Sequence, residues 1–216
     1  MPVGHTPDLN TFTCAGAELS VNLTREHYQQ LCQYARLIEQ WNEKINLISR
    51  KDTGRIFTYH IIDSLAASPF LPQNARCADI GTGAGLPGIP LAIVHPDISM
   101  LLIESTQKKC RFLQFALDRL QLKNCLFLCA RAEELAPLNC DIIISRLTAP
   151  LPKTLRYAAP HLKTGGTLIL YKSAPWEKEL TAEKKSLARY HFVLQKHITI
   201  KLPLTGIERH LIFLTR

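Results

Sequence analysis

Three glycines occupy alternate positions in the stretch DIGTGAGLPGIPLAI, residues 79–93. Gly81, Gly83 and Gly85 follow a short apolar run, and Pro87 stands two residues after the last of them. Glycine has no Cβ atom, so the backbone can turn tightly and approach a ligand closely. The first N–H groups of a helix are free to donate hydrogen bonds, and proline fits that first turn. The stretch therefore predicts a ligand-binding loop between a buried strand and a helix, with a plain structural turn as the alternative.

The glycine spacing bears on which cofactor such a loop would hold. A dinucleotide-binding loop has the spacing G-x-G-x-x-G, whereas this chain has G-x-G-x-G. Glu104 ends the next apolar run, where an acidic side chain accepts hydrogen bonds from a ribose. Nicotinamide enzymes and adenosylmethionine enzymes both use that acid. The altered glycine spacing and a predicted final hairpin favour S-adenosylmethionine as the cofactor. An NAD-dependent dehydrogenase is the alternative, and titration with a dinucleotide would distinguish the two.

Charged residues fall at or just beyond the ends of several predicted strands: Asp79, Glu104, Glu133, Arg146 and Lys172. The carboxyl ends of parallel strands meet at one edge of a sheet, so we expect these residues along a single crevice. Asp79 is equally explained as a satisfied loop carboxylate. Arg146 follows three isoleucines, and a guanidinium placed there needs an anionic or aromatic partner. Lys172 is also explained as a lysine at the rim of the crevice, whose apolar stem is buried while its charged end stays in water.

Two further groups of residues are candidates for contacts with a substrate. His60 and Asp63, three residues apart, would share one face of a helix. They are expected either to cap the pocket and position the substrate or to pack polar groups between helices. Arg209 lies in the last apolar run. The basic segment 108–111 is either a solvated helix face or, together with Arg209 and Arg216, part of a basic surface that extends towards the crevice.

Alternating apolar runs and helical stretches predict the fold after residue 75. The apolar runs cover residues 77–80, 99–104, 125–130, 140–145, 166–172, 191–200 and 209–215, and helices are expected near 87–94, 106–121, 149–160 and 176–188. This order predicts an α/β, Rossmann-like fold with a mostly parallel seven-stranded sheet. No helix separates the last two runs, so they predict a hairpin with an antiparallel C-terminal strand.

The first third of the chain lacks this alternation. Residues 1–22 are rich in Pro, Gly and Thr without periodicity, and we expect a flexible tail. Residues 23–70 predict a helical extension, with one long amphipathic helix capped by Thr24 and a second helix after Asp52 that stops at the segment SPFLP. Residues 71–216 would then form the main domain.

Charge and cysteine usage restrict the partners and the compartment. The net charge of +8 is carried by residues 76–216, which have +9, while residues 1–75 have −1. Such an excess of positive charge favours binding to nucleic acid or to an acidic membrane surface, although a soluble basic protein without such a partner can carry the same charge. Seven cysteines without a CxxC pair predict reduced thiols and no metal site. No signal segment or long apolar run is present, so we expect a cytoplasmic protein that does not enter a membrane.

Five segments together resemble one known family: HIIDSL (60–65), the glycine stretch (79–93), CRFLQFALDRLQLKN (110–124), ARAEEL (130–135) and ISR (144–146). They are similar to the bacterial small-subunit ribosomal RNA methyltransferase G family, also called glucose-inhibited division protein B. The resemblance covers roughly residues 23–216. It implies a class I adenosylmethionine-dependent methyltransferase that methylates guanine N7 in small-subunit (16S) ribosomal RNA.

The resemblance also implies roles for particular residues. It implies cofactor contacts from Gly81 and Leu86 in the first loop and from Ala132 and Glu133 after the third strand, and it places Arg146 at the reaction site. The loop and strand-end arguments add Gly83, Gly85, Glu104 and Arg146 to the expected cofactor contacts. From their positions in the predicted fold, His60 is expected beside Arg146 at the reaction site, and Lys172 and Arg209 are expected to contact the substrate. The chain departs from the family pattern at Tyr59, where an arginine is common, and at Leu147 and Thr148, where small residues are usual.

Guanine N7 carries a lone pair and no proton, so its methylation needs alignment and exclusion of water more than a general base. The expected partner is small-subunit ribosomal RNA or the assembled small subunit, bound by a monomer. Single-stranded or looped RNA is favoured, because a side chain cannot readily reach N7 in an A-form duplex. A methyltransferase for a small molecule or a protein and a non-enzymatic RNA-binding module are the alternatives. RNA-dependent activity and adenosylhomocysteine binding distinguish them.

Overall fold

The computed structural model describes residues 6–146 and 149–216 of the chain. A single seven-stranded sheet with the order β3-β2-β1-β4-β5-β7-β6 runs through it. Its strands are β1 (Arg76–Ile80), β2 (Ser99–Glu104), β3 (Cys125–Cys129), β4 (Cys140–Ser145), β5 (Leu162–Lys172), β6 (Val193–Lys201) and β7 (Glu208–Thr215). The first five strands pair in parallel, and β7 is antiparallel to both β5 and β6. The predicted sheet and its C-terminal hairpin are confirmed.

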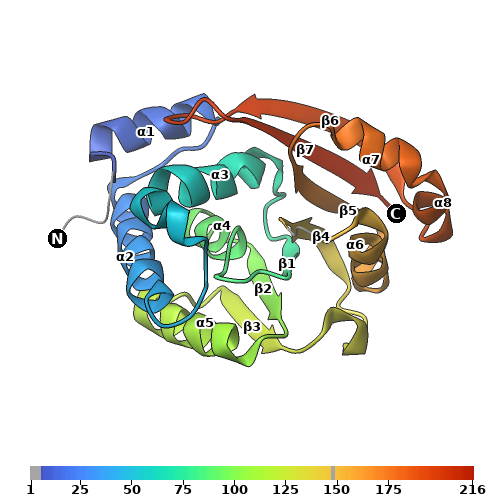
Figure 1. Cartoon of the computed structure of the whole chain (residues 1–216), viewed down its shortest axis with the longest axis horizontal. Coiled ribbons are helices and arrows are strands. Elements are labelled where there is room, and N and C mark those ends of the chain that lie inside the picture. The colour runs from blue at the N-terminus through green and yellow to red at the C-terminus, as the bar shows by residue number, and fades with distance from the viewer. Residues whose placement is uncertain (1–5, 147–148) are drawn as a thin grey trace.

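Helices cover both faces of this sheet, because alternate residues of the central strands are apolar on both sides. Cys77 and Ile144 face one apolar core, whereas Ala78 and Ile143 face the other. The first core includes residues of α2 (Arg25–Asn42), α4 (Gly88–Val94) and α5 (Gln107–Leu120), and the second those of α6 (Leu151–Ala158) and α7 (Trp176–Ala182). α8 (Lys184–Arg189) follows α7 on the same side (Figure 1). These elements match the helices expected from the sequence.

The segment before residue 23 contains a helix that the sequence did not predict. α1 spans Leu9–Glu18, and its N-cap Asp8 accepts a hydrogen bond from the Thr11 N–H at 2.8 Å. Phe12 is fully buried, with its ring centroid 5.7 Å from that of Phe57. The expectation of a flexible tail is therefore wrong for these residues. A helix this short, with few large apolar side chains, depends on tertiary packing more than on its own periodicity.

The first predicted long helix is present as α2, with Thr24 as its N-cap in a capping box completed by His27. The second is not a continuous α-helix. A 3₁₀ turn η1 (Arg50–Arg55), a π turn η2 (Ile56–Ile61), a short α3 (Ile62–Ser64) and a 3₁₀ turn η3 (Leu65–Phe70) follow one another. A π turn accommodates more residues per turn than an α-helix and is often found at functional sites. Here it places Tyr59 and His60 on the same cavity as Asp63.

Candidate functional site

Two cavities lie at the carboxyl ends of the central strands and have Ala149 in common. The first, here called the Glu104 cavity, has a volume of about 370 Å³. Its described lining residues are Ile80, Gly81, Ile103, Glu104, Ser105, Lys109, Ala130, Arg131, Ala132, Glu133, Ala149, Lys153 and Tyr157. The second, the Asp63 cavity, measures about 640 Å³ and contains both Arg146 and Arg209. The predicted crevice is thus a pair of adjoining cavities, the first on the β2 and β3 side and the second on the β5 and β7 side.

The glycine loop connects β1 to α4 beside the Glu104 cavity. Gly81, Gly83 and Gly85 have φ values of +72°, +61° and +88°, which L residues with a side chain rarely adopt. The Gly81 N–H donates to the Ile103 carbonyl at 2.8 Å, and this bond holds the start of the loop against β2. Gly81 lines the cavity. The alternation of glycines therefore follows from the left-handed backbone that the turn requires.

The remaining loop residues differ in what surrounds them. A Cβ atom at Gly83 would find open space, with only the Lys109 Nζ atom within 4.0 Å. A Cβ atom at Gly85 would lie 2.4 Å from Ile89 Cδ1, so that glycine is required by packing against α4. Leu86 is buried and precedes Pro87 through a cis peptide bond. The side of the loop that is open to a ligand is therefore at Gly81 and Gly83, not at Gly85 and Leu86.

Glu104 is 7% exposed and lines the cavity at the end of β2. Its Oε2 atom accepts from the Gly83 N–H at 3.1 Å, and its Oε1 atom accepts from the Thr106 N–H at 2.8 Å. The Lys109 Nζ atom lies 3.9 Å from Oε2. Each carboxylate oxygen has more than one lone pair, so acceptor capacity remains toward the cavity. The geometry fits the predicted ribose acceptor and also shows that Glu104 holds the glycine loop.

Asp79 does not line either cavity, although the sequence placed it in the crevice. It is completely buried beneath the loop. Its Oδ2 atom accepts from the Thr82 hydroxyl at 2.6 Å and from the Gly88 N–H at 2.8 Å. Burial raises the pKa of Asp79 to about 6. Of the two roles left open for this residue, the structure shows the loop carboxylate.

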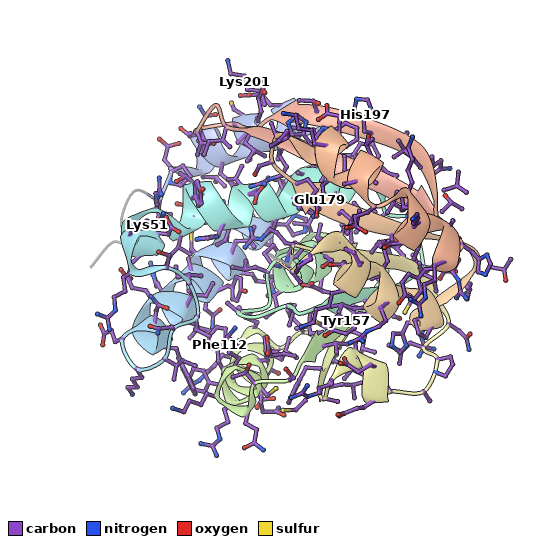
Figure 2. The ribbon with its side chains drawn as sticks, turned by 45° about the vertical axis from the view of Figure 1, so that its right-hand side comes forward. Lys51, Phe112, Tyr157, Glu179, His197 and Lys201 are labelled. Atoms are coloured by element: carbon purple, nitrogen blue, oxygen red, sulfur yellow. The ribbon has the colours of Figure 1, made fainter. Side chains whose placement is uncertain are left out.

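Ala132 and Glu133 line the Glu104 cavity from η4 (Ala132–Glu134). The Ala132 carbonyl accepts a hydrogen bond from His161 Nε2 at 2.8 Å, which fixes the backbone of this turn. Glu133 Oε1 lies 3.6 Å from Arg156 Nη2 on α6. Tyr157, labelled in Figure 2, is on the same helix and also lines the cavity. Ala132 and Glu133 were predicted from the sequence, whereas the contribution of Arg156 and Tyr157 on α6 was missed.

Arg146 projects from the end of β4 into the Asp63 cavity. Its Nη1 atom donates to Asp63 Oδ2 at 3.0 Å, and its Nη2 atom lies 3.3 Å from His60 Nδ1. Arginine has no acceptor, so His60 Nδ1 accepts and the imidazole proton is on Nε2. Burial, with the nearby Arg146 charge, lowers the pKa of His60 to about 4. His60 is therefore neutral near pH 7, and its Nε2 atom, 3.7 Å from Asp52 Oδ2, forms no ion pair there.

Lys172 and Arg209, predicted as substrate contacts, line the same cavity. The Lys172 Nζ atom lies 2.8 Å from Glu179 Oε1, a partner on α7 that sequence reasoning missed and that Figure 2 labels. Arg209 Nη1 donates to the Lys172 carbonyl at 3.4 Å. All four predicted reaction and substrate residues thus share one cavity. Leu147 and Thr148, where the chain departs from the family pattern, lie outside the described residues.

Among residues 6–146 and 149–216, no group of three or more His, Cys, Asp or Glu side chains is placed to hold a metal ion. Over the same residues, no helix combines the length and the apolar character needed to cross a membrane.

The sequence matches the model of one protein family, GidB, described as rRNA small subunit methyltransferase G, over residues 27–212. The chain belongs to this family. A relative from Chlorobium limicola, named ribosomal RNA small subunit methyltransferase G, is 38% identical over 189 residues, which cover 87% of this chain and 86% of the relative. A relative of the same name from Ruegeria pomeroyi is 34% identical, with 94% of this chain and 98% of the relative covered.

Solved structures share the fold of this methyltransferase G family member at low sequence identity. M. jannaschii TYW2 in complex with AdoMet has a TM-score of 0.61 and 17% identity, covering 80% of this chain and 78% of that protein. A SAM-dependent methyltransferase from Aquifex aeolicus has a TM-score of 0.57 and 16% identity, covering 77% of this chain and 95% of that protein. The predicted class I methyltransferase fold is confirmed, and the family match spans both cavities.

Proposed function

We propose that this chain transfers a methyl group from S-adenosylmethionine to guanine N7 of small-subunit ribosomal RNA. The observation that carries the proposal is the adjoining pair of cavities, one beside the glycine loop and Glu104, the other rich in cations. The family and its relatives are named for small-subunit ribosomal RNA methylation, which supports the reaction type and the substrate class. The charge of +9 on residues 76–216 favours a polyanionic substrate.

The Glu104 cavity has the chemical groups that adenosylmethionine requires. The open side of Gly83 allows close approach of a ligand to the loop, and Glu104 offers acceptors for ribose hydroxyls. Ala132 and Glu133 form a further wall, and Lys109 and Arg131 supply cations. When bound, adenosylmethionine supplies a methyl group on a positively charged sulfur. Gly85 and Leu86, by contrast, would support the loop from beneath.

The Asp63 cavity would hold the guanosine and its phosphate. Guanine N7 has a free lone pair, so the reaction needs no residue to remove a proton. His60 is neutral near pH 7, and its Nδ1 atom is used by Arg146, which fits a positioning role better than a proton-transfer role. Arg146 would orient the base through O6 or bind a phosphate. Its positive charge, unfavourable beside a base that becomes cationic, is partly neutralised by Asp63.

Methyl transfer from labelled adenosylmethionine to small-subunit ribosomal RNA tests the proposal, with naked RNA and the assembled small subunit compared and the modified base mapped. We expect N7-methylguanosine at one site. Replacing Arg146 with Ala should lower turnover and leave adenosylhomocysteine binding unchanged, whereas equal loss of both would make Arg146 a cofactor residue. Binding of adenosylmethionine without methyl transfer to either form of RNA would refute RNA as the substrate. A small molecule or a protein would then be the methyl acceptor to test. A monomeric state and a cytoplasmic location stay predictions.

A further inference from the structure

One buried carboxylate holds two arginines that are far apart in the sequence. Asp63 Oδ1 accepts from Arg209 Nε at 2.6 Å, and Oδ2 accepts from Arg209 Nη2 at 3.1 Å. The same Oδ2 accepts from Arg146 Nη1 at 3.0 Å. The Asp63 side chain is 2% exposed, against 18% for Arg146 and 14% for Arg209. The carboxylate is therefore almost enclosed at the wall of the cavity, and the two guanidiniums are the more exposed groups beside it.

The charges of the Asp63 cavity do not balance. Its described lining includes three cations, Arg146, Lys172 and Arg209, and two carboxylates, Asp63 and Glu179. His60 is neutral, so one positive charge remains without a carboxylate of its own. Lys172 is paired with Glu179. The excess therefore belongs to the two arginines that share Asp63, and it faces a cavity proposed to receive a phosphate-bearing nucleoside.

The backbone that carries Asp63 is fixed by hydrogen bonds to the sheet. The hydroxyl of Tyr171, buried on β5, donates to the Ser64 carbonyl at 2.6 Å and accepts from the Ala67 N–H at 3.1 Å. The Ser64 hydroxyl donates to the His60 carbonyl at 2.7 Å. Asp63 thus comes from a segment that cannot shift without breaking these bonds. Its carboxylate is a fixed reference point for both guanidiniums.

We propose that Asp63 is a positioning residue that aims the guanidiniums of Arg146 and Arg209 at the phosphate and base edge of the RNA substrate. This inference rests on the proposed function. Asp63 itself would not touch RNA, because both of its oxygens are used by arginines and its side chain is enclosed. The two bonds to Arg209 fix its guanidinium plane as well as its charge, which a lysine would not do. The guanidinium of Arg146 is held by one bond to Asp63 and one to His60 Nδ1.

The test compares Asp63→Asn and Arg209→Lys with the unaltered protein in methyl transfer to small-subunit RNA. Asparagine keeps the shape of the side chain but turns an amide N–H₂ group toward one arginine. Lysine keeps the charge of Arg209 but loses the paired bonds. We expect each variant to lower kcat/KM for RNA by roughly 10- to 100-fold, the range that charge-assisted hydrogen bonds produce. Affinity for adenosylhomocysteine should stay within about twofold, because these residues line the other cavity.

Two controls separate positioning from a general structural effect. Asp141→Asn removes a carboxylate that pairs with Lys163 at 2.7 Å at the opposite, amino-terminal end of the strands, and it should leave both parameters unchanged. The double variant Asp63→Asn, Arg209→Lys should lose less than the product of the two single losses, because both changes remove the same alignment. Should Asp63→Asn fail to bind adenosylhomocysteine through misfolding, Arg209→Lys alone is decisive.

Three results would overturn the inference. An unchanged kcat/KM for RNA in Arg209→Lys would show that the paired geometry is irrelevant. Losses that multiply fully in the double variant would show that the two residues act independently. Failure of the unaltered protein to methylate or bind RNA would refute the proposed function, and the inference with it, and is recognised by the absence of activity before any substitution is made.

Discussion

Alanine at Gly83 and alanine at Gly85 should have different consequences, although the two glycines are only two residues apart in one loop. Both have positive φ, at +61° and +88°, so each substitution costs about 1–2 kcal/mol of backbone strain. A Cβ atom at Gly83 would meet nothing closer than the Lys109 Nζ atom at 4.0 Å. The free energy of unfolding of Gly83→Ala should therefore fall by the strain alone.

Gly85→Ala adds a steric conflict to the same strain. The new Cβ atom would lie 2.4 Å from Ile89 Cδ1 and 3.1 Å from the Tyr34 hydroxyl. Both neighbours are fully buried, so neither side chain has free space to enter. Overpacking of this kind costs about 1–3 kcal/mol. The expected total is roughly 2–5 kcal/mol, from the strain and the overpacking together.

Urea unfolding and calorimetric titration with adenosylhomocysteine distinguish the two variants. Gly83→Ala should bind the ligand at least about tenfold more weakly, a change equivalent to ~1.4 kcal/mol, because its methyl group occupies the open side of the loop. Gly85→Ala should unfold at clearly lower urea than Gly83→Ala. Wild-type affinity in Gly83→Ala would refute the close approach of ligand to the loop. Equal stability of the two variants would refute the packing argument at Gly85.

Three other substitutions test separate parts of the structure. Tyr171→Phe removes the hydroxyl bonded to Ser64 and Ala67 and should lower the free energy of unfolding by about 1–3 kcal/mol in urea titrations. Burial lowers the pKa of His60 from 6.5 to about 4, so the folded state disfavours protonation of this side chain. The free energy of unfolding should therefore fall as the pH decreases from about 6.5 towards 4, by up to roughly 3 kcal/mol. His60→Asn should flatten that pH dependence, and an unchanged slope would contradict the assignment. Glu104→Gln should weaken adenosylhomocysteine binding about tenfold while RNA affinity in a filter-binding assay is unchanged, since hydrogen bonds to charged acceptors are the stronger ones.

The central strands could be predicted from the sequence because they are short apolar runs that are buried for most of their length. The run CDIIIS, for example, coincides with β4, Cys140–Ser145. The alternating glycines likewise marked a turn with left-handed backbone. α1 could not be found in this way, because its helix is stabilised by the contacts of Phe12 with Tyr28 and Phe57, which come from other parts of the chain. Periodicity carries no information about such contacts.

Glu104, Glu133, Arg146 and Lys172 were identified from strand ends as residues of the two cavities, but most of their partners were not. Arg209 and Asp63 are 146 positions apart, and Arg146 and Asp63 are 83 apart. No spacing rule relates them, since their contact depends on how a helical segment packs over the end of a sheet. Asp79 shows the reverse case. Its position after a strand suggested the crevice, whereas two hydrogen bonds from the loop take its carboxylate into the interior.

The segment predicted as a separate helical extension contributes to both cavities. Tyr34 on α2 is fully buried and donates from its hydroxyl to the Ala84 carbonyl at 2.5 Å, so this helix supports the glycine loop. Asp63 on α3 holds the two arginines of the other cavity. Residues 23–70 therefore do not merely precede the methyltransferase fold. This one continuous stretch supports the glycine loop beside Glu104 through Tyr34 and supplies the carboxylate that pairs with Arg146. The relative placement of the two cavities therefore depends on how residues 23–70 pack against the sheet.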